Sequence, residues 1–352
     1  MRVILSSPVL TLGVSFALVA GIMGGSFTLP MKYLGRWSWE NVWAIFILVS
    51  CVLMPMLFAW RTVPAWRQVL ASAPPAAVTT ATLSGLVWGF GAIMFGLGVS
   101  AVGVSMANTL VLAISASLGS ILPISLLAPE RFRRPQGHAI ILGAVVGIAG
   151  IACCGYAGLL RERSQGSEKE RLRGNLVGAS QPIAIGLALC FGAGVLSAVL
   201  NIGYTAARPV LAAATRVGYS PFAGSNLIWL LLLTSGAVPN LCFCGYLLKK
   251  NSSWKKFVMP RTTMLYALGI LMGIFWGGDI FLYGFASPQI GTLGPAIAWP
   301  LKLIGGLLTA NVIGYFIGEW KHTLARERYL MMAGLAVLVM AILILARAST
   351  LG

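Results

Sequence analysis

The chain has 352 residues, of which 58% are hydrophobic and only 9% are charged, and its mean hydropathy is +0.88. So little charge cannot coat the surface of a soluble protein of this size, and the composition therefore excludes a water-soluble globular fold. The net charge of +17 does not indicate a nucleic-acid partner, because the Lys and Arg residues stand in short groups between apolar runs, which is typical of membrane-protein loops beside anionic lipid.

Ten apolar runs are about as long as the ~20 residues that a membrane-spanning helix needs. The runs cover residues 8–31, 41–60, 79–100, 104–128, 137–160, 179–206, 222–248, 262–286, 291–317 and 329–347. The first run follows Arg2 in the manner of a signal peptide, but it continues to about Pro30, so we interpret it as the first spanning helix. The sequence predicts an all-α polytopic membrane protein with about ten transmembrane helices.

The longest gap between the runs, residues 161–178, is charged and has no apolar period, which predicts a solvated linker. It separates a first five-helix unit, residues 1–160, from a second, residues 179–352. More Lys and Arg residues fall on the linker side of the predicted bundle than on the side of the two termini. The positive-inside rule therefore places the linker in the cytoplasm and both termini outside.

Two of the predicted helices match without a gap at an offset of 188 residues. The matched positions are Gly85, Trp88, Gly89, Gly96 and Gly103 in the third helix and Gly273, Trp276, Gly277, Gly284 and Gly291 in the eighth helix and the turn that follows it. The eighth helix comes five spans after the third, and an odd offset reverses the direction in which a helix is inserted. The match predicts two inverted five-helix repeats, as in many secondary transporters, and convergent glycine-rich packing is the alternative.

The sequence carries none of the motifs of an enzyme or an ATP-driven pump. The two histidines, His138 and His322, stand at helix ends beside basic loops, and there is no Walker A loop, zinc-protease motif or nucleophile elbow. We therefore expect a protein that is not an enzyme and has no cofactor or metal site. If it transports a solute, an ion gradient or the substrate gradient must drive it.

Two ionisable residues, Asp279 and Lys302, lie inside the eighth and ninth apolar runs. A charge at the bilayer centre costs about 2.5–3.5 kcal/mol on insertion scales, so it usually faces a cavity or a partner. The two residues lie at similar depths from the turn between their helices, so we expect them to pair. One hypothesis is that Asp279 binds and releases a proton, with Lys302 tuning it or contacting substrate. The alternative is a static ion pair. The positions 188 residues earlier, Gly91 and Ile114, are uncharged, so only the second half carries such a pair.

Neutral polar and aromatic residues inside the runs are the candidates for substrate binding. A sugar site needs amides and hydroxyls for hydrogen bonds and an aromatic ring against the sugar C–H face. The candidates are Trp88, Asn108, Asn201, Trp276, Tyr283 and Trp299. The alternative for each asparagine is an interhelical hydrogen bond, and for each tryptophan it is close packing against glycine.

Several segments carry a family resemblance. Phe27-x-x-Pro30-x-Lys32, followed by Arg36-Trp37-Ser38-Trp39-Glu40, resembles the start of the L-rhamnose/proton symporter family, which belongs to the drug/metabolite transporter superfamily. Further matches are Gly85-x-x-Trp88-Gly89-x-Gly91, Gly96-Leu97, Gly103-x-Ser105-Met106, Gly119, Pro123-Ile124, Ser197-Ala198, Ala206-Ala207-Arg208-Pro209, Gly273, Trp276, Phe281, Tyr283, Trp299, Leu301 and Glu319-Trp320. The resemblance implies a ten-helix bundle in the bacterial inner membrane that takes up a deoxy-sugar with protons.

The chain departs from this family pattern at three positions. The resemblance implies an uncharged amide at the position of Asp279, a histidine at that of Lys302 and an acidic residue at that of Pro295. The resemblance makes rhamnose the first candidate substrate, and because the chain departs at these positions, fucose, another monosaccharide or a different metabolite are alternatives. A metabolite exporter or facilitator and a non-transporting scaffold or sensor are the alternative functions, and the sequence leaves the oligomeric state open.

Overall fold

The computed structural model describes residues 8–33, 35–102, 104–164, 183–318, 320–321 and 323–351. These residues form helices joined by short connections, and no strand occurs among them. Ten of the described helices or helical stretches are long and apolar enough to cross a membrane. The prediction of an all-α polytopic membrane protein with about ten spans is confirmed.

The first five spans lie between Pro8 and Ser164. They are α1 (Pro8–Ser26), the continuous stretch α2, η2 and α3 (Trp39–Ile47, Leu48–Leu53 and Met54–Thr62), α5 (Pro75–Val102), α6 (Val104–Leu127) and α7 (Pro135–Ser164). The shorter helices η1 (Leu29–Tyr33), α4 (Trp66–Ser72) and η3 (Pro129–Arg133) connect them. The segment η2 is a π-helix, and Pro55 is the second residue after it. Proline lacks the N–H that would bond to the preceding turn, and a wider local turn accommodates that loss.

The last five spans lie between Ile183 and Ala348. They are α9 (Ile183–Ala206), α11 (Pro221–Lys250), α12 (Thr263–Ile290), α13 (Gly294–Phe316) and α14 (Ala325–Ala348), with α10 (Arg208–Arg216) and η4 (Ser253–Val258) as connections. The helix α7 extends to Ser164, past the expected start of the linker at residue 161. Residues 165–178 of that linker, and Gly103 of the predicted repeat, lie outside the described residues, and the division into two units stays a prediction.

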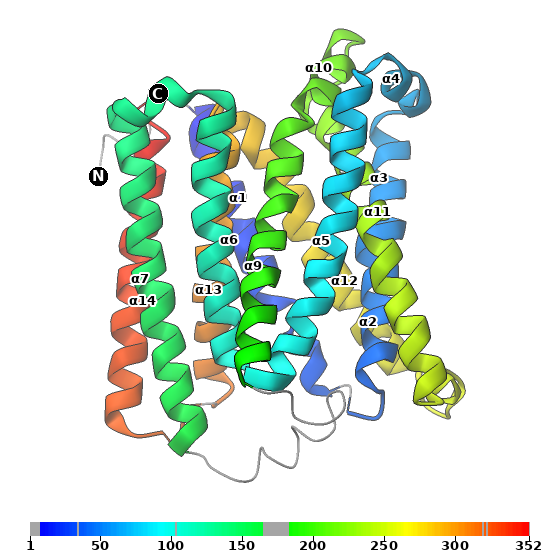
Figure 1. Ribbon diagram of the computed structural model, residues 1–352, viewed down its shortest axis with the longest axis vertical. Helices are drawn as coiled ribbons and strands as arrows, with labels where there is room; N and C mark the ends of the chain where they lie inside the picture. The colour runs from blue at the N-terminus through cyan, green and yellow to red at the C-terminus, as the bar shows by residue number, and fades with distance from the viewer. Residues whose placement is uncertain are drawn as a thin grey trace.

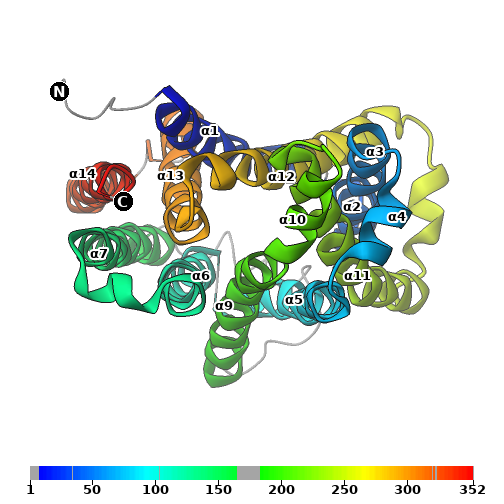
Figure 2. The same ribbon diagram turned by 90° about the horizontal axis from the view of Figure 1, so that it is seen from above.

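The helices stand side by side in a bundle that is longer than it is wide when seen along the helix axes (Figures 1 and 2). Packing partners correspond between the first five and last five spans: α1 packs along α12 and α13, and α9 packs along α5 and α6. The pairs α7–α14 and α6–α13 join equivalent positions of the two sets. An inverted repeat requires such a correspondence, and the repeat itself stays a prediction.

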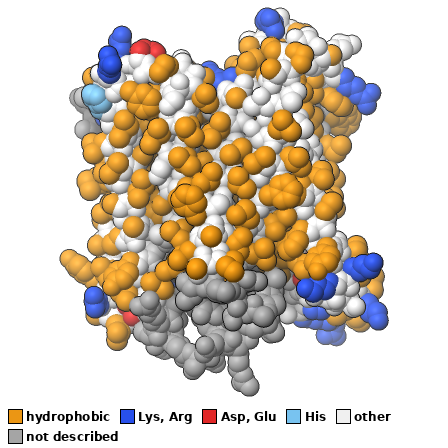
Figure 3. Space-filling view, in the orientation of Figure 1, with side chains coloured by type: hydrophobic (Ala, Val, Ile, Leu, Met, Phe, Trp, Pro, Cys, Tyr) orange, Lys and Arg blue, Asp and Glu red, His pale blue; other side chains and the backbone are white. Residues whose placement is uncertain are grey.

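The outer surface of the bundle is apolar between two charged ends. Hydrophobic side chains cover the height of the face in Figure 3, while Lys and Arg side chains gather at both ends. Leu142, Phe191 and Leu343, on three different helices, are each more than half exposed. The helix α1 begins and α14 ends at the same end of the bundle (Figure 1). That this end faces the outside of the cell stays a prediction.

Glycine allows α1 to pack closely against α13. A Cβ atom at Gly21 would lie 2.7 Å from the carbonyl oxygen of Lys302, and one at Gly25 would collide with the carbonyl oxygen of Gly306. Small residues let helix backbones approach in this way, and in lipid such packing is a main source of helix association. The contact fixes α1 over the part of α13 that carries Lys302.

Candidate functional site

A buried ion pair lies between α12 and α13. The ammonium Nζ of Lys302 is 2.7 Å from Oδ2 of Asp279, and the two side chains are 3% and 8% exposed. The turn at Gly291, whose φ of 93° favours glycine, reverses the chain so that both residues lie about two to three helical turns from it. The structure therefore confirms the predicted pairing. A role in proton coupling stays a prediction.

The carboxylate of Asp279 uses only one of its two oxygens. Its Oδ2 accepts from Lys302, whereas Oδ1 is buried and has no hydrogen-bond partner among the described residues. The helix α1 covers the pair, because a Cβ atom at Gly24 would lie 2.9 Å from Oδ2. Most buried polar atoms in proteins are hydrogen-bonded, so an unpartnered carboxylate oxygen marks a place where a proton, water or ligand can be accommodated.

Two aromatic rings lie beside the ammonium of Lys302. Its Nζ is 4.7 Å from the ring centroid of Trp299 and 5.7 Å from that of Tyr283. The two rings meet edge to face, with centroids 5.4 Å apart and an interplanar angle of 77°. Cation–π attraction strengthens when the charge is removed from water, so both rings help to hold Lys302 in the interior.

Asn201 of α9 connects the same cluster to three other helices. Its Oδ1 accepts a hydrogen bond from the Tyr283 hydroxyl, and its Nδ2 donates to the carbonyl oxygens of Gly119 at 2.9 Å and Pro295 at 3.2 Å. These are the interhelical hydrogen bonds that the sequence offers as the alternative to substrate binding. Both Nδ2 hydrogens are used, so a sugar that accepts from Asn201 must replace one of these bonds, whereas a sugar hydroxyl can donate to the second lone pair of Oδ1.

The indole of Trp299 fits against α6 because Gly119 has no side chain. A Cβ atom at Gly119 would lie 2.7 Å from the indole Nε1, and that nitrogen donates to the hydroxyl of Ser115 at 3.3 Å. Both contacts on α6 come from small residues. Asn201, Asp279, Tyr283, Trp299 and Lys302 thus form one contiguous group, which we name the central cluster.

The other three candidates lie outside the central cluster. Trp88 and Trp276 stack on each other with centroids 5.4 Å apart and an interplanar angle of 17°, and Phe46 meets Trp276 edge to face. A Cβ atom at Gly236 would lie 2.6 Å from the Trp88 ring, which is the close packing against glycine expected as the alternative. Asn108 is half-buried on α6 and does not hydrogen-bond to either group. The predicted residues are therefore not brought together in a single site.

Sequence reasoning missed two aromatic residues that extend the central cluster. Tyr204 and Trp229 stack with centroids 4.8 Å apart, and their rings lie 5.3 and 5.9 Å from that of Tyr283. The sequence spacing could have identified Tyr204, because it follows Asn201 by one helical turn on α9 and so lies on the same face of that helix. Trp229 is an interior tryptophan like Trp299, far from the ends of α11.

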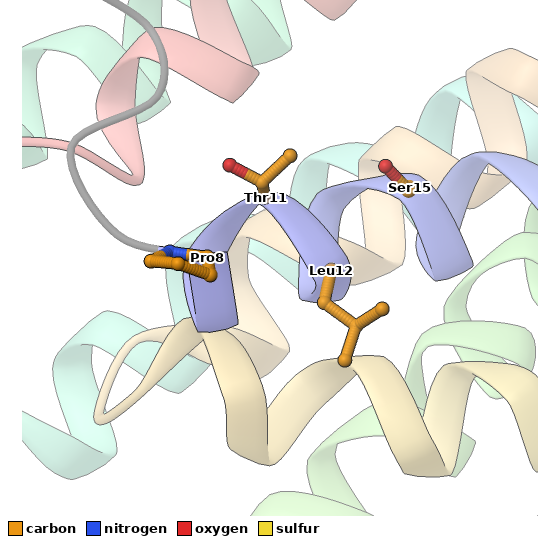
Figure 4. Close-up of a pocket in the computed structure, with 4 residues that line it drawn as sticks. All are labelled: Pro8, Thr11, Leu12 and Ser15. Atoms are coloured by element: carbon orange, nitrogen blue, oxygen red, sulfur yellow. The ribbon is translucent and has the colours of Figure 1, made fainter.

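A surface pocket lies elsewhere, away from these residues. It has a volume of about 400 Å³ and is lined by Pro8, Thr11, Leu12 and Ser15 at the start of α1 (Figure 4). None of the candidate residues borders it. No group of His, Cys, Asp and Glu side chains suited to a metal occurs among the described residues.

A bundle of ten candidate spanning helices around a buried charge pair and a polar aromatic cluster defines the protein as a multi-pass membrane protein, and its family is one of transporters, not of enzymes. Sequence similarity to known proteins identifies the family of transporters. The chain belongs to the family of the L-rhamnose-proton symport protein (RhaT), whose sequence profile matches residues 6–350.

Curated relatives match over nearly their whole length. The L-rhamnose-proton symporter of Pectobacterium atrosepticum is 26% identical over 344 residues, which covers 96% of this chain and 97% of the relative. Those of Yersinia pestis and Yersinia pseudotuberculosis are 27% identical over 339 residues, covering 94% of this chain and 95% of each relative. The family resemblance predicted from the sequence is confirmed.

Proposed function

We propose that this chain carries a small sugar together with protons into the cell, with L-rhamnose as the first candidate. The observation that carries the proposal is the Asp279–Lys302 pair, buried beside aromatic and amide groups in a chain of the RhaT family. The names of the relatives, L-rhamnose-proton symporters, support both the class of substrate and the coupling ion. The protein would act in the bacterial inner membrane as a member of the drug/metabolite superfamily.

In this proposal Asp279 is the group that binds the proton. Protonation of its carboxylate removes the counter-charge of Lys302, which is only 3% exposed. Breaking a buried ion pair in this way costs about 3–5 kcal/mol, because one charge is left uncompensated. A protonated carrier without substrate is therefore unfavourable, and the empty carrier keeps its ion pair.

A bound sugar offsets that cost. Sugar hydroxyl oxygens accept hydrogen bonds from an ammonium, and the rings of Trp299 and Tyr283 offer apolar faces to the sugar C–H groups and to the methyl group of a deoxy-sugar. Proton and sugar binding then favour each other. Because such coupling is reciprocal, the proton raises the affinity for sugar by the same factor as sugar raises the affinity for the proton.

Hydrogen bonds between connecting segments at both ends of the bundle support an occluded state of this carrier. At the end with the termini, Arg208 donates to the carbonyl oxygen of Thr292 at 3.0 Å. At the opposite end, the indole Nε1 of Trp37 donates to the carbonyl oxygen of Lys256 at 3.0 Å. The first bond joins two connections of the second half, and the second joins the two halves, so opening at the end with Trp37 would break the second bond, as alternating access of two inverted halves requires.

The test uses the purified protein in liposomes with an imposed pH gradient. We expect labelled L-rhamnose to accumulate inside against its concentration gradient, and a protonophore to abolish the accumulation. Equilibration without accumulation would favour a facilitator, and would contradict proton coupling. No flux of any tested monosaccharide, with the protein shown in the bilayer, would contradict the sugar assignment and favour an exporter, scaffold or sensor.

A further inference from the structure

Two hydrogen-bond donors next to the central cluster make no hydrogen bond of acceptable geometry within the described part of the chain. The hydroxyl of Tyr204 and the indole Nε1 of Trp229 are both buried without a partner among the described residues. Their residues are 1% and 0% exposed, so water at the surface does not reach them. Buried donors are nearly always paired in folded proteins, and in a membrane interior no solvent replaces a missing partner.

The two donors come from different helices and share one location. Tyr204 is in the last turn of α9 and Trp229 is in α11, and their rings are stacked 4.8 Å apart. The hydroxyls of Ser225 and Ser287 lie beside that of Tyr204. A Cβ atom at Gly284 would lie 2.5 Å from Nε1 of Trp229, so a side chain there would cover this donor.

This location is continuous with the ion pair. Tyr204 and Trp229 both touch Tyr283, which in turn meets Trp299 and Lys302. The helices α9 and α12 approach each other here mainly through side chains, namely the contacts of Asn201 and Tyr204 with Tyr283. Rearranging these side chains would open space between the two helices without breaking close backbone packing.

We propose that Tyr204 and Trp229 are substrate-binding residues whose O–H and N–H groups donate to two hydroxyl oxygens of the transported sugar. This inference rests on the proposed function and deepens it, because it assigns hydroxyl recognition to α9 and α11 and leaves charge coupling to α12 and α13. At Tyr204 a packing role alone would be met by phenylalanine, which fills nearly the same space without burying an unpaired hydroxyl, and at Trp229 an apolar side chain would avoid burying an unpaired N–H. The ligand class is a neutral polyol with adjacent hydroxyl groups.

The experiment compares Tyr204→Phe and Trp229→Phe with wild type in liposomes, using labelled L-rhamnose and its monodeoxy analogues. Each variant lacks one donor, and loss of a neutral hydrogen bond predicts a KM for rhamnose that is about fivefold to tenfold higher at similar kcat. Each variant should also lose the preference of wild type for rhamnose over one monodeoxy analogue. The matched controls are Tyr156→Phe and Trp60→Phe, whose side chains are 47% and 61% exposed, and both should keep the wild-type KM.

Thermal unfolding separates binding from packing. Without sugar, Tyr204→Phe should leave the Tm equal to or above that of wild type, whereas Trp229→Phe should lower it somewhat, because the smaller ring leaves a cavity. With rhamnose at a fixed concentration, the rise in Tm should be smaller in the variants, because stabilisation by a bound ligand increases with the logarithm of its affinity. A packing role predicts an unchanged rise in Tm.

Analogue binding to the wild-type protein needs no variant and does not depend on how the variants fold. If every monodeoxy analogue competes as well as rhamnose, or if both variants keep the wild-type KM and selectivity, the assignment of Tyr204 and Trp229 is wrong while sugar transport stands. If wild type transports and binds no monosaccharide, the proposed function fails and this assignment fails with it.

Discussion

Removing both charges of the central ion pair distinguishes proton coupling from a static structural role. We expect Asp279→Asn with Lys302→Met to fold, to exchange sugar across the membrane with a raised KM because the ammonium donor is lost, and to lose all proton-driven accumulation. The double change keeps the shapes of the side chains and removes the group that would bind the proton. The two single variants are its controls.

The expected loss of folding free energy in each variant follows from the burial of the ion pair. Asp279→Asn alone leaves the ammonium of Lys302 unpaired at 3% exposure, and Lys302→Met leaves the carboxylate unpaired at 8% exposure. Each single change should cost about 3–5 kcal/mol, a large part of a typical folding free energy of about 5–15 kcal/mol. The double change should cost far less, because a buried ion pair and a neutral pair of similar volume are often nearly equal in stability.

The assay has two parts. Thermal unfolding of all four proteins gives the coupling energy of the pair from a double-mutant cycle. Liposomes then report accumulation of labelled rhamnose under a pH gradient and exchange of internal for external rhamnose without one. If the double variant still accumulates sugar and the protonophore still abolishes this accumulation, Asp279 is not the coupling group and the pair is static.

Three further predictions address the surroundings of the pair and the closed end of the bundle. Gly24→Ala should weaken proton-driven accumulation in liposomes, because its Cβ would press on the buried carboxylate, while Gly245→Ala, which meets nothing within 4 Å, should not. Asn201→Ala should lower the unfolding free energy by about 1–3 kcal/mol by leaving the Tyr283 hydroxyl unpaired, and adding Tyr283→Phe should recover part of the loss in chemical denaturation. Trp37→Phe should increase amide exchange in the connection between α11 and α12 several-fold, and unchanged exchange would show that its hydrogen bond does not hold that end closed.

The pairing of Asp279 with Lys302 could be predicted because a charge in an apolar run has few acceptable environments. The short connection between the two helices fixed their relative depth, and depth was enough to identify the partner. The spans could be predicted for a similar reason, because length and hydropathy alone determine whether a helix can cross a bilayer.

The members of the central cluster could not all be predicted, because a membrane helix is apolar both inside the bundle and towards lipid. Trp60 and Trp229 both lie within apolar helices, yet one is 61% exposed and the other is fully buried. In a soluble protein the polar face of a helix would have distinguished them, and here that signal is nearly absent. The separation of Trp88 and Trp276 from Asn201 has the same cause, since the rotation of a helix about its axis is not encoded in its hydropathy.

The chemistry of the proposed site is concentrated in the second half of the chain. Asn201, Tyr204, Tyr283 and the ion pair all follow the charged linker, and the first half covers them mainly with glycine and serine. Gly24 of α1 lies against the carboxylate, and Gly119 of α6 accommodates the Trp299 indole. Few side-chain hydrogen bonds join this cover to the cluster, chiefly those of Asn201 to the Gly119 carbonyl and of Trp299 to Ser115. In the proposed cycle these are the bonds that would exchange when the first half shifts, and the ion pair would move with the α12–α13 hairpin. The second half would then hold substrate and proton, and the position of the first half would determine which side of the membrane they meet.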